Sequence, residues 1–217
     1  MIELQNDFFD YEMKEKIFTS INKASSYFEG SLSKFYIYLK ESKKNSYQQD
    51  NSIQDFQDLM EFTIFISQNW LDISSAFQTY LNPFNDYQKI YGLKNLIIHL
   101  NEGYKRLIHF EGKKRKESLL ESLIKEIVKE NEEFEMEYIS IIKNLEIYSQ
   151  KFQNNQLKYK RGLFVHYEGL PSAVYENSIN IDVENLNNNA LEYVKILGRI
   201  IEFVTKIMNK IYLRKSE

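Results

Sequence analysis

The chain of 217 residues is 43% hydrophobic and 27% charged, which is typical of a globular protein that can bury a sizeable core. Its formal net charge of −3 argues against a general nucleic-acid coat protein, because such proteins neutralise phosphates with excess lysine and arginine, although a local basic patch stays open. The lack of cysteine excludes disulfides, thiolate metal sites and cysteine nucleophiles.

The start of the chain, MIELQNDFFDYEMKEK, has acidic residues where a secretory signal would have a basic segment followed by an apolar run. No apolar run approaches the roughly 20 residues that a bilayer span needs. We therefore expect a cytoplasmic protein without membrane contact. No internal repeat and no Pro-rich or Ser-rich linker divides the sequence, which predicts one domain over residues 1–217.

Apolar residues recur in steps of three and four along five stretches, the pattern of amphipathic helices. Only seven glycines and two prolines are present, so we expect long helices with few turns. Ser52 and Asp55 form a capping-box start for the second helix. The sequence predicts an all-α fold, an antiparallel bundle of about five long helices. The stripes cover residues 17–39, 56–77, 90–107, 120–152 and 186–211.

The helical spacing fails between Glu168 and Glu184, where EGLPSAVYENSINID contains Gly, Pro and Asn. Within it, SINIDV alternates like a short strand. We expect one long loop before the last helix, containing at most a small β-hairpin between Ser172 and Val183. Long loops inside compact domains are disproportionately functional.

Several chemistries have no support in the sequence. No glycine-rich phosphate loop and no nucleophile elbow occurs, and the Glu-x-x-His spacing of di-iron bundles fails at every histidine, so we expect no cofactor and no metal. His99 and His109 are interpreted as partly buried structural histidines. The run KKRK at 113–116 is interpreted as a solvated turn. The residues three positions before the histidines are Leu96, Arg106 and Leu163.

The stretch LKYKRGLFVHYEGLPS sets Arg161 and His166 five residues apart, behind a lysine-rich approach. Metal-free RNA cleavage needs a base for the ribose hydroxyl, an acid for the leaving oxygen and fixed positive charge on the phosphorane. Imidazole exchanges protons near neutral pH, and guanidinium grips phosphate oxygens bidentately. In the alternative interpretation, Arg161 caps a helix end and His166 fills a half-buried corner.

Arg161-x-x-x-x-His166, set between a long helix and a last amphipathic one, resembles the HEPN superfamily over residues 86–213. The resemblance implies a metal-independent endoribonuclease or RNA-binding component of a toxin or phage-defence system. It also implies a homodimer in which two motifs meet, and an antitoxin or other protein as partner. Active members usually have a polar residue after the arginine, where Gly162 stands here. In some, a tyrosine stands two residues beyond the histidine, whereas Tyr167 is adjacent to it.

Positions five residues apart on an ideal α-helix face about 140° apart, so the two motif side chains would diverge. A helix break at Gly162, or a second motif supplied across a two-fold axis, would bring them together. Lys158, Lys160 and Tyr167 are candidate supporting groups. The alternative function is a non-catalytic helical-bundle protein-interaction module in which both motif residues are structural.

Overall fold

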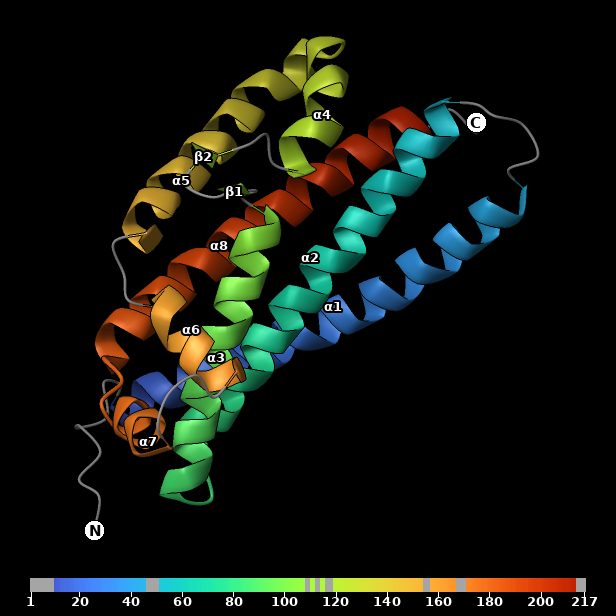
Figure 1. Ribbon diagram of the computed structural model, residues 1–217. Helices are drawn as coiled ribbons and strands as arrows, with labels where there is room; N and C mark the ends of the chain where they lie inside the picture. Colours follow the sequence, from blue (N-terminus) through green and yellow to red (C-terminus); the bar gives the residue numbers. More distant parts are fainter. Residues whose placement is uncertain are drawn as a thin grey trace.

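The computed structural model describes residues 10–45, 51–107, 110–111, 114–115, 119–153, 157–166 and 171–213. In these ranges the fold is all-α apart from one minimal hairpin, which confirms the predicted class (Figure 1). They contain eight α-helices, so the prediction of five is wrong. The helices are α1 (Tyr11–Asn45), α2 (Asn51–Leu81), α3 (Asp86–Leu107), α4 (Leu119–Lys129), α5 (Glu135–Gln153), α6 (Leu157–His166), α7 (Pro171–Ile179) and α8 (Val183–Ile207).

Three helices begin at a side-chain cap. Asp10, Asn85 and Asp182 precede α1, α3 and α8, and each accepts a hydrogen bond from the backbone N–H three residues further on, at 2.8, 2.8 and 3.0 Å. Such caps satisfy N–H groups that have no partner inside the helix. The starts of these helices are therefore determined locally by the sequence.

The long helices α1, α2, α8 and α5 follow one another across the molecule (Figure 1). The helix α3 packs against α2, and α6 in turn packs against α3. Buried side chains from Phe28 on α1 to Met208 after α8 belong to one hydrophobic cluster. The helix α3 thus connects the main row of helices to the helix that carries the predicted motif.

Two glycines of α3 allow it to approach α2 closely. A Cβ atom on Gly92 would lie 2.7 Å from the backbone nitrogen of Tyr80. A Cβ atom on Gly103 would lie 2.0 Å from Oδ1 of Asn69. Contacts this short do not occur in folded proteins, so a side chain at 92 would push the two helices apart, and one at 103 would displace the Asn69 side chain.

The side chain that Gly103 accommodates joins three helices. Asn69 on α2 donates a hydrogen bond to the backbone carbonyl of His99 on α3, at 3.1 Å. Its Oδ1 accepts a hydrogen bond from the hydroxyl of Tyr193 on α8, also at 3.1 Å. Burial raises the pKa of Tyr193, which keeps this hydroxyl a donor. The Asn69 junction therefore fixes α3 relative to both α2 and α8.

The predicted fourth helix is interrupted at Asn131. The α4 helix ends at Lys129, and a short 3-10 turn over Glu132–Phe134 leads into α5. The Asn131 side chain donates a hydrogen bond to the carbonyl of Ile127 at 2.8 Å, which satisfies a carbonyl at the end of α4. The break places buried Phe134 edge-on against Phe203 of α8, with ring centroids 6.0 Å apart.

The predicted loop and hairpin between Ser172 and Val183 are wrong. Pro171 starts α7 instead of ending a helix, because the first helical position needs no N–H and suits the fixed φ of proline. The alternation in SINIDV arises because Ile181 is buried and Asp182 caps α8. In the described residues the strand pairing is instead Phe110–Glu111 (β1) with Lys114–Arg115 (β2), and β2 lies within the basic run predicted to be a turn.

The close α2–α3 contact predicts opposite effects for two glycine-to-alanine changes. Gly92→Ala should lower the free energy of unfolding by about 1–3 kcal/mol, because the methyl group meets backbone atoms of α2. Gly30→Ala, in a part of α1 where a Cβ meets nothing, should raise it by about 0.5–1 kcal/mol. Urea unfolding followed by circular dichroism measures both; equal effects would contradict the close approach.

Candidate functional site

The predicted motif lies on α6, which runs through Gly162 without interruption. The predicted alternative of a helix break at Gly162 is therefore wrong. Arg161 stands in the middle of the helix and His166 is its last residue, so their positions face about 140° apart. The side chain of His166 and all of Tyr167 lie outside the described residues. Within one chain, helical geometry directs the two motif positions apart.

Arg161 forms an ion pair with α3. Its Nη2 lies 2.5 Å from Oε1 of Glu102, and the arginine side chain is only 20% exposed. The same oxygen lies 3.6 Å from the ammonium of Lys105, one helical turn away. A guanidinium has five N–H donors in a rigid plane, so a carboxylate at one edge also fixes the direction of the others. Glu102 therefore orients Arg161 and holds α6 on α3.

Lys160 links α6 to the connection between α7 and α8. Its Nζ donates a hydrogen bond to the backbone carbonyl of Asn180 at 3.3 Å. Partial burial lowers the pKa of Lys160, and the nearby carboxylate of Asp182 acts in the opposite direction. Lys158, the other predicted lysine, lies in the first turn of α6, and its side chain is not among those described.

The opposite end of α6 contacts an aromatic and basic surface of α3. Phe164 is buried, and Nζ of Lys94 lies 5.3 Å from its ring centroid. Burial lowers the pKa of Lys94. Tyr87 and Tyr91, both exposed, line a small pocket of about 120 Å³ together with Lys94 and Phe164. Exposed rings beside a lysine can stack on bases and contact a phosphate.

Sequence reasoning missed Glu102 and the Lys94 surface. Apart from Asp86 at its first position, Glu102 is the only acidic residue of α3, and this isolation was a usable signal. No spacing rule could pair it with Arg161, which lies 59 residues further on. His99 is a partly buried residue with Nδ1 3.7 Å from Asp72. His109 lies outside the described residues.

Within the described residues, no three His, Asp or Glu side chains come together as a metal-binding set. None of the described helices combines the length and the hydropathy that a membrane span requires. No protein-family model, curated protein or solved structure matches the chain. The function is therefore inferred from the residues and their contacts.

The Arg161–Glu102 pair predicts a measurable coupling. In a double-mutant cycle of Arg161→Met and Glu102→Gln, the free energies of unfolding should show a coupling of about 0.5–1 kcal/mol, because one partner is largely buried while the other is screened by solvent. Molar salt should reduce it. The matched cycle of Lys105→Met with Glu102→Gln should give a coupling of less than about 0.3 kcal/mol. If this coupling were as large as that of Arg161 with Glu102, the 2.5 Å ion pair would not be what holds α6 on α3.

Proposed function

We propose that the chain is a HEPN-like, metal-independent endoribonuclease whose site is completed by a second copy. The observation that carries the proposal is that Arg161 and His166 lie on one unbroken helix of an all-α bundle, and that Phe164 of this helix packs beside Lys94 and the exposed rings of Tyr87 and Tyr91. The helix itself has three basic and no acidic residues. A local positive surface in a chain of net charge −3 suits an RNA backbone.

In this proposal each group has a defined role. Arg161 contacts a phosphate oxygen, and its charge stabilises the phosphorane. His166 transfers a proton as general acid or base. Lys158 and Lys160 add positive charge along the RNA, and Tyr167 supports the histidine. The tyrosines of α3 stack on a neighbouring base.

The proposal needs a second copy because the two motif positions of one chain face in different directions. Because α6 has no break, its two motif positions face about 140° apart. Arg161 is also held towards α3 by Glu102, which leaves it little freedom to swing round the helix. In a homodimer with a two-fold axis near α6, the arginine of one chain meets the histidine of the other.

The nuclease proposal predicts which residues single-stranded RNA cleavage needs. His166→Ala and Arg161→Ala should each reduce cleavage in EDTA by about 10²-fold or more, because each removes a group acting directly on the phosphate. The matched controls are His99→Ala and Arg106→Ala, a histidine and an arginine of α3 outside the motif, which should keep wild-type rates. A labelled oligonucleotide on a gel gives the rates, and circular dichroism checks folding.

A wild-type chain that neither binds nor cleaves RNA under these conditions would contradict the nuclease proposal. So would equal losses in the motif variants and the α3 controls.

The composite site predicts complementation between inactive chains. Arg161→Ala and His166→Ala chains, inactive alone, should regain about a quarter of wild-type activity when co-refolded. Half of the dimers are then mixed, and each mixed dimer holds one intact site of two. Light scattering should give the mass of two chains. A dimeric mixture that stays inactive would rule out a site shared in this way.

The interaction-module alternative is favoured by a specific observation. Arg161 pairs with Glu102, and Lys160 bonds to a backbone carbonyl, so both cations have structural partners inside the chain. In that function, Arg161→Ala weakens the attachment of α6 and lowers stability, and RNA is not a ligand. A variant that loses stability in step with RNA binding would favour the module.

A further inference from the structure

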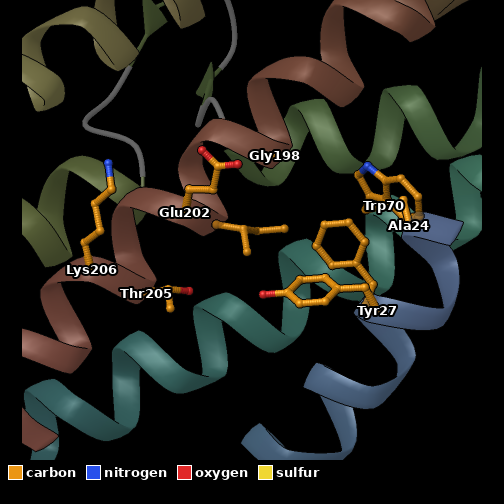
Figure 2. Close-up of a pocket in the computed structure, with 9 residues that line it drawn as sticks. Ala24, Tyr27, Trp70, Gly198, Glu202, Thr205 and Lys206 are labelled. Carbon is orange, nitrogen blue, oxygen red and sulfur yellow. The ribbon is translucent and has the colours of Figure 1, made fainter. Parts of the chain in front are cut away.

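A groove lies between α1 and α8, beside Trp70 of α2 (Figure 2). Its volume is about 540 Å³, and its walls are mainly apolar. Tyr27 extends from α1 with its hydroxyl directed across the groove towards Thr205 of α8 (Figure 2). Phe28 and Trp70 form the floor, with ring centroids 4.4 Å apart. The two walls, both long helices, therefore enclose a groove with room for further side chains.

The α8 wall of the groove contains Gly198, and the packing of the fold does not require a glycine at this position. A Cβ on Gly198 would meet no atom within 4 Å, unlike those on Gly92 and Gly103. Glycine inside a helix costs about 1 kcal/mol relative to alanine. Across the groove stands Ala24, another small residue. Small residues on facing walls allow the backbone of an inserted helix to come close.

Three exposed lysines stand on the two helices that form the walls of the groove, while the one lysine of its lining, Lys206, is paired with Glu137 at 2.9 Å. Lys23 and Lys34 stand four residues before and seven after Tyr27, so helical periodicity puts them on the same flank of α1. Lys195, three residues before Gly198, is on the α8 side. All three are exposed, and the described residues give none of them a partner. Glu202 is the acidic residue of the groove lining.

We propose that this groove binds an amphipathic helix of a partner protein, with apolar residues on one face and acidic residues on both flanks. The apolar face fills the groove above Phe28 and Trp70, a small residue of the partner lies over Gly198, and acidic side chains pair with Lys23 and Lys34. The site is remote from α6 in sequence and does not depend on the proposed RNA activity.

Two other occupants fit less well. Single-stranded RNA would meet one exposed ring of the lining, Tyr27, but Trp70 is only 5% exposed and the groove walls are mainly apolar. A second copy could offer the exposed apolar residues Met136, Ile139 and Ile147 of α5, but exposed Lys143 stands among them and would face the exposed lysines of α1 and α8. An acidic helix satisfies both the apolar floor and the charge of these lysines.

The probe is a fluorescent peptide of about five helical turns, with leucine on one face, alanine at its centre and glutamate elsewhere. Anisotropy should show micromolar binding to the full chain, weakened by salt. Gly198→Leu should reduce the affinity about tenfold or more, because the new side chain occupies open space in the groove without disturbing the fold. Gln150→Leu, at an exposed position of α5 outside the groove lining, is the control and should bind within about twofold of wild type.

Charge is tested separately. Lys23→Glu with Lys34→Glu should weaken binding of the glutamate peptide, and a peptide with lysine in place of glutamate should bind the wild type at least about tenfold more weakly. Absence of binding, or equal loss in the Gly198→Leu and Gln150→Leu variants, would overturn the inference. It would also fail if Gly198→Leu abolished dimer formation, or if single-stranded RNA displaced the peptide from the groove.

Discussion

The contact between Asn69 and Gly103 is the constraint on which the position of α3 depends. The asparagine side chain occupies the space that any other residue at 103 would fill, and it bonds to α3 and to Tyr193 of α8 at the same time. A buried amide whose donor and acceptor both have partners selects one arrangement of the three helices. A shift of any one helix would leave a buried polar group without a partner. The helix α3 is therefore held in one place, although it lies outside the main row of helices.

That position determines what α6 can do. Glu102 stands one residue before Gly103, so the junction that fixes α3 also fixes the carboxylate that Arg161 meets. In the nuclease proposal this ion pair aims the guanidinium before RNA arrives, which lowers the entropy lost on binding. In the module alternative the same pair is simply the attachment of a short helix. The two functions use one contact and differ in whether the guanidinium also binds a phosphate.

The sequence predicted those helices whose positions depend on the local pattern of apolar residues. Apolar spacing located α1, α2, α3 and α8, because one face of each long helix is buried along its length. It failed at Asn131, where a side-chain bond to Ile127 and the packing of Phe134 decide the break. It failed at Pro171 because proline starts a helix as readily as it ends one.

The motif was located from the sequence, but its surroundings were not. Spacing on one helix predicted the divergence of Arg161 and His166, which needs only the helical repeat. The partner Glu102 comes from tertiary packing across 59 positions, and a single sequence carries no signal for such a pairing. The groove beside Tyr27 was missed for the same reason, since its walls come from opposite ends of the chain.

Hydrogen exchange of the α6 amides tests the central claim most directly, namely that Glu102 holds α6 and its arginine in place. In Glu102→Gln, amides of residues 157–166 should exchange about fivefold faster, equivalent to about 1 kcal/mol, while α2 and α3 keep their protection. Glu192→Gln, which breaks the 2.8 Å pair of α8 with Lys151, should leave α6 unchanged. Unchanged exchange of α6 in Glu102→Gln, or faster exchange throughout the chain, would contradict the account.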